Sequence, residues 1–199
     1  MKAWKGVFLL LAVLCLSSVD GQSSESESDQ EVDNDDEVTL ETVSSSFSAE
    51  EAEAILEEHN RLRGLVSPEA SNMLVMEWDD VLASTAQKWS DRCVFEHSSL
   101  TGRSAGSGFT WVGQNLFAAT GSAADIGVRG TVYWYNETFH YDYEANTCTP
   151  KKECRHYTQV VWASTHAVGC GKSFCSKLTI PGEEGMTDAT FVTCNYGPA

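Results

Sequence analysis

Basic residues are scarce in this sequence of 199 residues. Lys and Arg number 13 against 29 Asp and Glu, which gives a formal net charge of −16 at pH 7. Within residues 47–199 the corresponding counts are 11 and 19. Proteins that bind nucleic acid or anionic membranes display clustered positive charge. We therefore expect neither nucleic acid nor an anionic membrane surface as a partner.

Long apolar runs are absent after the first 21 residues, so we expect no transmembrane segment. At the start of the chain, Lys2 and Lys5 precede an uncharged apolar stretch over residues 6–16, and small and polar residues follow. This order is typical of a secretory signal peptide, which is too short to anchor a protein in a bilayer. Val19 and Gly21 suit a cleavage site after residue 21. We predict a signal peptide over residues 1–21 and a soluble, secreted, extracellular protein.

Residues 22–46 contain nine acidic side chains and no basic one. So little apolar content cannot offset the entropy lost on ordering, and we predict an acidic disordered leader. A solvating tail is the favoured role, while a cation-binding or propeptide role stays open. Residues 47–199 are predicted to form one domain, which buries about two thirds of its unfolded surface.

The sequence lacks the closely spaced Cys-x-x-Cys pairs of a zinc knuckle. Of its seven cysteines, Cys15 leaves with the signal peptide. The six that remain, in an oxidising compartment, indicate three disulfides. The sequence pattern alone allows fifteen different pairings.

Hydrophobic periodicity places helices first and strands last. A capping box of Ser48 and Glu51 starts a helix that ends at Gly64, and two further helices are expected over residues 79–93 and 123–138. A Gly- and Ser-rich loop covers residues 98–110. Extended runs are expected at residues 73–78, 157–162, 167–174 and 190–196. This order predicts an α+β fold in which helices pack on an antiparallel sheet.

One apparent catalytic motif lies in the Gly- and Ser-rich loop. Residues 102–106 read GRSAG, the Gly-x-Ser-x-Gly pattern of a hydrolase nucleophile elbow. That motif works only where a strand delivers the serine into a sharp turn before a helix. No strand is expected before Ser104, and we interpret the match as chance.

Four segments resemble, in order, the signature segments of one family: HNRLR at 59–63, GQNLF at 113–117, CRHYTQVVWAST at 154–165 and FVTCNYGPA at 191–199. They are similar to the CAP superfamily, which includes cysteine-rich secretory proteins, insect venom antigen 5 and the first class of plant pathogenesis-related proteins. The resemblance covers essentially all of residues 50–199. Related chains usually continue past the position of Ala199, so this CAP domain, also called an SCP domain, is either truncated or complete there.

The resemblance implies a three-layer α/β/α sandwich held by three disulfides. The pairs implied are Cys93–Cys175, Cys148–Cys154 and Cys170–Cys194. His59, Asn60 and Arg63, one helical turn apart, are interpreted in this family context as a structural polar cluster that ties the first helix to the core.

The family resemblance also implies a central cavity lined by two histidines and two acidic residues. The matching positions here are His97, Glu137 and His156, with neutral Gln114 at the fourth. Two imidazoles and a carboxylate suit zinc or a similar cation. Because an amide oxygen is a weaker ligand than a carboxylate, Gln114 predicts reduced affinity. We expect no required cofactor and take Zn²⁺ as the candidate cation, with core packing of His156 as the alternative.

Two surface features complete the prediction. In some family members sterol binding is associated with an aromatic loop, which here contains Phe139, Tyr141 and Tyr143. These side chains suit an apolar ligand, although packing of the tyrosines on the sheet edge is an equal alternative. Asn136 begins an N-glycosylation sequon.

We therefore predict a secreted, non-enzymatic binding module for a cation, a small hydrophobic ligand or an extracellular protein. The alternative is a secreted peptidase-like hydrolase that uses His97 or His156 as base and Glu137 as orienting acid, with a metal-activated water as nucleophile. This alternative is weaker because the six mature cysteines are assigned to disulfides. In addition, Gln114 cannot titrate, so a carboxylate pair that could divide acid and base roles is missing.

Overall fold

The computed structural model describes residues 46–199. The predicted signal peptide and nearly all of the predicted acidic leader lie outside the described residues, and their boundaries stay predictions.

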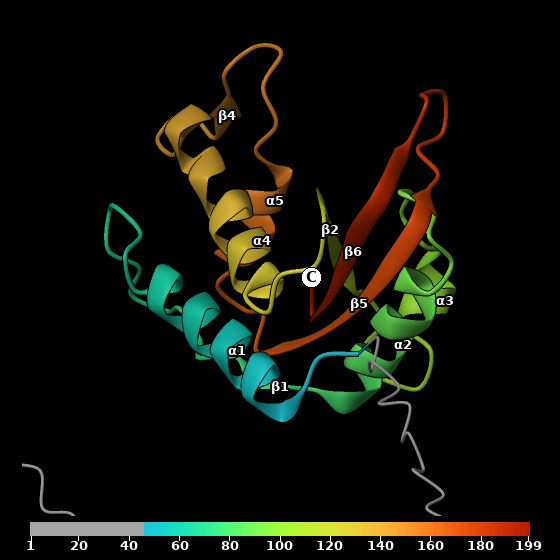
Figure 1. Cartoon of the computed structure of the whole chain (residues 1–199). Coiled ribbons are helices and arrows are strands. Elements are labelled where there is room, and N and C mark those ends of the chain that lie inside the picture. Colours follow the sequence, from blue (N-terminus) through green and yellow to red (C-terminus); the bar gives the residue numbers. More distant parts are fainter. Residues whose placement is uncertain (1–45) are drawn as a thin grey trace, which may run out of the picture. The chain divides into compact units, whose positions relative to one another are not determined.

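One sheet between two layers of helices organises the described part of the chain (Figure 1). One face of the sheet carries α2 (Asp80–Ser90) and α3 (Leu100–Arg103). The other face carries α1 (Ala49–Arg63), α4 (Ile126–Tyr135) and α5 (Arg155–Val160). The expected three-layer α/β/α sandwich is confirmed.

The sheet has the strand order β1-β5-β6-β2. Its centre is a hairpin of β5 (Ala167–Leu178) and β6 (Met186–Gly197), and β2 (Gly113–Thr120) pairs antiparallel with β6. The three long strands form the expected antiparallel sheet. The short strand β1 (Glu77–Trp78) lies at the end of the extended run expected over residues 73–78, and its parallel pairing with β5 was not predicted.

Several local expectations differ from the structure, and the loop expected over residues 98–110 contains the short helix α3. Residues 157–162, expected as a strand, contribute instead to α5 and the turn after it, while β2 was not predicted as a strand. The apolar residues of this segment fit either structure, since Tyr157 and Val160 are buried at helical spacing. Carboxylates from outside the helix accept hydrogen bonds from its first amide groups, and this stabilises the helix over the expected strand.

The starts of α1 and α2 follow their sequence signals. Ser48 accepts a hydrogen bond from the amide of Glu51 at 3.3 Å, and the Glu51 carboxylate accepts one from the amide of Ser48 at 2.9 Å. This reciprocal pair is the predicted capping box. Asp79 caps α2 by accepting from the amide of Leu82 at 2.8 Å. The helix predicted to reach residue 138 ends earlier, and a 3₁₀ helix, η1 (Asn136–His140), continues it.

Two glycines in β5 let α2 lie directly on the sheet. A Cβ atom added at Gly169 would collide with the backbone at Ala83, and one at Gly171 would collide with the backbone of Gln87. The strand and helix backbones can approach this closely only because these residues have no side chain. The approach brings Ser90 of α2 to Thr193 of β6, where the two hydroxyl groups are hydrogen-bonded at 3.0 Å.

Three disulfides connect the outer elements to this frame. Cys170–Cys194 joins β5 to β6, and Cys93–Cys175 ties the loop after α2 to β5. Cys148–Cys154 joins the end of β4 (Thr147–Cys148), which pairs with β3 (Tyr141–Asp142), to the residue before α5. These are the pairs that the family resemblance implies.

Candidate functional site

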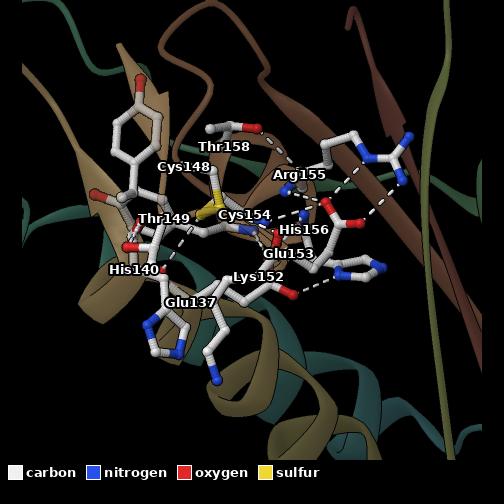
Figure 2. The surroundings of a disulfide bond; sticks show 12 residues. Glu137, His140, Cys148, Thr149, Lys152, Glu153, Cys154, Arg155, His156 and Thr158 are labelled. Atoms are coloured by element: carbon white, nitrogen blue, oxygen red, sulfur yellow. Dashed lines mark hydrogen bonds and ion pairs between the residues drawn. A yellow bond between two sulfur atoms is a disulfide. The ribbon is translucent and has the colours of Figure 1, made fainter. Parts of the chain in front are cut away.

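Glu137 and His156 are in direct contact on the helical face that holds α4 and α5. Glu137 belongs to η1 and His156 to the first turn of α5. The Oε1 atom of Glu137 lies 2.6 Å from Nδ1 of His156 (Figure 2). Because a carboxylate can only accept, Nδ1 of His156 carries the proton and donates the hydrogen bond to Glu137. The Nε2 atom of His156 therefore keeps a free lone pair when the ring is neutral.

The second oxygen of Glu137 binds the backbone of α5. Its Oε2 accepts hydrogen bonds from the amides of His156 and Tyr157, both at 3.1 Å. Glu153, which directly precedes Cys154, similarly accepts hydrogen bonds from the amides of Cys154 and Arg155, at 3.1 and 3.0 Å. Two carboxylates thus satisfy four amide groups at the start of α5, where negative charge is favourable. Glu137 holds the helix and orients its histidine at the same time.

The other pair of the predicted cavity is His97 and Gln114. Gln114 lies in β2, and its Oε1 is 3.1 Å from Nδ1 of His97. The same oxygen accepts from the amide of Ser98 at 2.9 Å, while Nε2 of Gln114 donates to Ser98 and to Asn195. These partners fix which end of the Gln114 side-chain amide is the oxygen. Because that oxygen can only accept, Nδ1 of His97 donates the hydrogen bond to it.

The surroundings of His97 disfavour its protonation. Burial lowers the pKa of His97, and the hydrogen bond to Gln114 offsets this only in part. The positive charges of Arg103 and Arg155 lower it further. The neutral ring of His97 then offers Nε2 as an acceptor.

A metal ion would find fewer ligands here than the sequence suggests. Among residues 46–199, no group of three or more His, Cys, Asp or Glu side chains is arranged to hold a metal ion. Glu137 and Gln114 are engaged by the hydrogen bonds described above, so they orient the rings as the outer partners of metal-binding histidines do. The predicted set of His97, Glu137 and His156 therefore does not come together as three ligands. Of the predicted ligands, only the Nε2 atoms of His97 and His156 make no hydrogen bond within residues 46–199.

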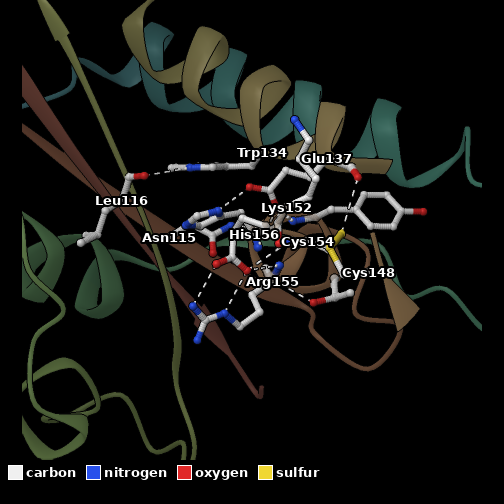
Figure 3. Close-up of polar contacts among 12 residues, drawn as sticks. Asn115, Leu116, Trp134, Glu137, Cys148, Lys152, Cys154, Arg155 and His156 are labelled. Carbon is white, nitrogen blue, oxygen red and sulfur yellow. Dashed lines mark hydrogen bonds and ion pairs between the residues drawn. A yellow bond between two sulfur atoms is a disulfide. The ribbon is translucent and has the colours of Figure 1, made fainter. Parts of the chain in front are cut away.

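Asn115 is a site residue that sequence reasoning missed. It is buried in β2, and its Nδ2 donates to the carbonyl oxygen of His156 at 3.1 Å (Figure 3). Its position beside Gln114 in GQNLF was the only available signal, and the sequence gives no means of locating its partner. Asn115 fixes the backbone of His156 against the sheet.

His59 and Arg63 have the structural role that was expected of them. Buried His59 lies 2.8 Å from the carbonyl oxygen of Ile55 through Nδ1 and 2.9 Å from the hydroxyl of Tyr196 through Nε2. Burial lowers the pKa of His59 to about 4.

Buried Arg63 donates to four backbone carbonyl groups, which belong to Leu74, Val160, Trp162 and Thr165. Asn60 binds both the amide and the carbonyl of Met76, at 2.8 and 3.0 Å. Together these two side chains tie α1 to the chain around β1 and to the segment after α5.

Ser104 lacks the geometry of a nucleophile. Its hydroxyl donates to the carbonyl oxygen of Leu100 at 2.9 Å, and it follows the short helix α3 with no strand before it. The strand, turn and helix of a nucleophile elbow are absent from this part of the described chain. The interpretation of GRSAG as a chance match agrees with this environment.

The aromatic loop lines two neighbouring hollows in the surface, and Tyr141 and Tyr143 belong to both. Tyr141 and Tyr143 line a pocket of about 370 Å³ together with residues from the loop after α1 and from the end of α5. The other lining residues include Val66, Met73, Val161 and Trp162. Phe139 is not part of this pocket: it is 80% exposed and lines a neighbouring hollow, which Tyr141, Tyr143, Thr149 and Pro150 also line. Asn136, the predicted glycosylation site, is exposed.

Fold and site together define a disulfide-stabilised α/β/α domain in which a carboxylate and an amide each orient one histidine. The family model of the cysteine-rich secretory protein family, CAP, matches residues 56–196, and the chain belongs to this family. No helix among the described residues is long and apolar enough to cross a membrane.

Curated relatives and solved structures agree with this assignment. Human peptidase inhibitor 16 is 42% identical over 149 residues, a match that covers 75% of this chain and 30% of that protein. The venom allergen-like protein 4 of Schistosoma mansoni superposes with a TM-score of 0.61 at 25% identity, covering 76% of this chain and 90% of that one. A related structure solved with Zn²⁺ has a TM-score of 0.60 at 26% identity and covers 77% and 82% of the two chains.

Proposed function

We propose that this chain is a secreted, non-enzymatic binding module whose pocket beside Tyr141 and Tyr143 holds a small hydrophobic ligand. The observation that carries the proposal is the pocket of about 370 Å³, whose size falls within the range of small-molecule sites. Aliphatic side chains and Trp162 form much of the wall, while the hydroxyl groups of the tyrosines offer polar contacts. These features suit a sterol or another compact lipid.

A fluorescent sterol, dehydroergosterol, tests this proposal with the secreted full chain. Trp162 lines the pocket, so bound sterol is expected to quench tryptophan emission by energy transfer. Trp162→Phe should reduce this transfer while leaving the affinity, measured by sterol anisotropy, nearly unchanged.

Substitutions in the pocket provide the decisive comparison. Met73→Asp and Tyr143→Asp place a charge in the apolar wall, and we expect each to weaken binding at least about tenfold. Phe139→Ala, which lies outside this pocket, is the matched control and should bind as wild type does. Equal affinity in all of these variants would refute the pocket as the lipid site.

Cation binding is a second candidate, which we infer from the two oriented histidines. Both rings donate through Nδ1, leaving Nε2 of His97 and His156 for a cation such as Zn²⁺. The related structure that contains Zn²⁺ supports this candidate. With two protein ligands and water completing the coordination, binding is expected to be weak and not required for folding.

Calorimetric titration with Zn²⁺ tests the cation site. His156→Ala is expected to abolish binding, whereas the exposed His166→Ala should leave it unchanged. Gln114→Glu adds negative charge, so we expect tighter binding. It should also lower stability, because Gln114 donates to Ser98 and Asn195. Unchanged zinc affinity in His156→Ala would leave His156 a packing residue only.

The hydrolase alternative has less support. All six cysteines of the described domain form disulfides, and the Ser104 hydroxyl is directed at a carbonyl group. Both oxygens of Glu137 are bound to α5 and its histidine. Peptidase activity that co-purifies with the wild-type protein and disappears in His156→Ala would restore this alternative.

A further inference from the structure

Residues 151–155, which lead into α5, carry three basic side chains and one acidic side chain on an otherwise acidic protein. Lys151, Lys152 and Arg155 lie within five consecutive residues, whereas residues 47–199 contain 19 acidic and 11 basic side chains. We call the exposed surface formed by Phe139, Pro150, Lys151, Lys152 and Arg155 the basic turn. Figure 2 shows Lys152, Arg155 and His140 around the Cys148–Cys154 disulfide.

The nearby carboxylates do not neutralise the two lysines. Within the described residues, the ammonium groups of Lys151 and Lys152 take part in no ion pair. Glu153 is paired with Arg155 at 2.9 Å and also binds two amides at the start of α5. Glu137 is bound to His156 and two amides. Both lysines are exposed, so their charges are available to a partner.

The basic turn is held in one shape before any partner binds. The amide of Lys152 donates to the carbonyl oxygen of Thr149 at 3.0 Å, and Lys151 has a φ of 67°, so Pro150 and Lys151 form the corner of a tight turn. The Cys148–Cys154 disulfide closes the segment. Thr149 anchors it to η1 through two hydrogen bonds to the carbonyl oxygen of His140, at 2.8 and 3.1 Å. A preformed loop loses little conformational entropy on binding.

An exposed aromatic ring shares a surface hollow with Pro150, the residue before Lys151. Phe139 is 80% exposed and lines a surface hollow with Thr149 and Pro150. Asp142 and Glu144 also line this hollow. A long polyanion, such as a sulfated glycan, would meet these carboxylates. A short polypeptide with a few carboxylates and one apolar side chain fits the surface better.

We propose that the basic turn is a docking site for an acidic segment of an extracellular protein, with carboxylates on Lys151 and Lys152 and an apolar side chain on Phe139. None of its five residues lines the Tyr141 and Tyr143 pocket, although Phe139 and Pro150 line the neighbouring hollow that shares these two tyrosines. Charge complementarity supplies specificity and a faster association rate, and the affinity of such a small site is modest.

A dye-labelled peptide, Glu-Glu-Phe-Glu-Glu, tests the proposal by fluorescence anisotropy with the secreted full chain. An exposed ion pair changes an equilibrium constant by up to about fivefold, so Lys151→Ala with Lys152→Ala should weaken binding about tenfold. Phe139→Ala should weaken it independently of the ionic strength, whereas the contribution of the lysines should fade at high salt.

The control variant is Lys177→Ala, an exposed lysine on β5 that should leave the affinity unchanged. The control peptide replaces every Glu with Gln and should not bind. Equal peptide affinity in wild type and the double lysine variant would overturn the proposal. So would a Lys177→Ala variant that loses as much affinity as the double lysine variant does. So would heparin binding that depends on the two lysines while the acidic peptide fails to bind. Near-ultraviolet circular dichroism confirms that each variant is folded.

Discussion

The Glu137 carboxylate contacts both the imidazole of His156 and the backbone that carries this imidazole. One oxygen lies 2.6 Å from Nδ1 of His156, and the other accepts from the amides of His156 and Tyr157 (Figure 3). A change at Glu137 must therefore affect the stability of α5 and the orientation of the histidine together.

Glu137→Gln is expected to lower the free energy of unfolding by about 1 to 3 kcal/mol, because hydrogen bonds to a charged acceptor are replaced by weaker ones. Chemical denaturation at neutral pH measures the loss. Nitrogen-15 NMR of the His156 ring should also show a weaker preference for the proton on Nδ1. Glu183→Gln, an exposed residue in the turn between β5 and β6, is the matched control. Equal stability of Glu137→Gln and the control would contradict the capping role.

Stability should decrease in mild acid because of His59. The pKa of this buried ring is about 4 in the folded protein, against an ordinary value of 6.5. The unfolded state therefore binds a proton that the folded state rejects between these two pH values. Stability from this residue is complete above pH 6.5 and falls as the pH drops to 4, by about 3 kcal/mol at about 1.4 kcal/mol per pH unit.

His59→Gln tests the assignment of this pH dependence. The variant is less stable at neutral pH because it alters the contact with Tyr196, but it should lose less stability than wild type on acidification. Urea denaturation at several pH values provides the comparison, with the exposed His166→Gln as control. If His59→Gln and wild type lose the same stability in acid, the dependence comes from other groups.

The three disulfides should differ in their contributions to stability. By the loop-entropy relation, Cys93–Cys175 with a separation of 82 residues contributes about 4 to 5 kcal/mol, and Cys148–Cys154 with a separation of 6 contributes about 2 kcal/mol. Replacing each pair by serines and measuring the free energy of unfolding tests the order. Peptide mapping of the unreduced protein tests the pairing itself, and a peptide joining Cys148 to Cys175 would contradict it.

Arg61 and Arg63 provide a matched pair of basic residues in the last turn of α1. Arg63→Lys is expected to lower the free energy of unfolding by about 2 to 4 kcal/mol, because one ammonium group cannot reach all four carbonyl acceptors. Arg61→Lys should change it by less than about 0.5 kcal/mol, since Arg61 is exposed and binds only Glu58. Similar effects of the two substitutions in thermal or urea unfolding would be inconsistent with a structural role for Arg63.

Local sequence signals determined much of this fold. Ser48 and Glu51 define the start of α1 because both partners of the capping box are three residues apart. The signature segments identified the family, and through it the disulfide pairs and the choice of His97, Gln114, Glu137 and His156 as candidate site residues. Signals of this kind act over a few residues or rest on resemblance, so they are readable without coordinates.

Tertiary structure decided what these residues do. The helix at Arg155–Val160 depends on Glu137, which lies 19 residues before His156 in sequence, so its local apolar pattern could not distinguish helix from strand. The same contact makes Glu137 a partner of His156 and leaves too few side chains for a three-ligand metal site among residues 46–199. The sequence identifies the titratable residues, whereas hydrogen bonds between distant segments determine which of their atoms remain available to a ligand.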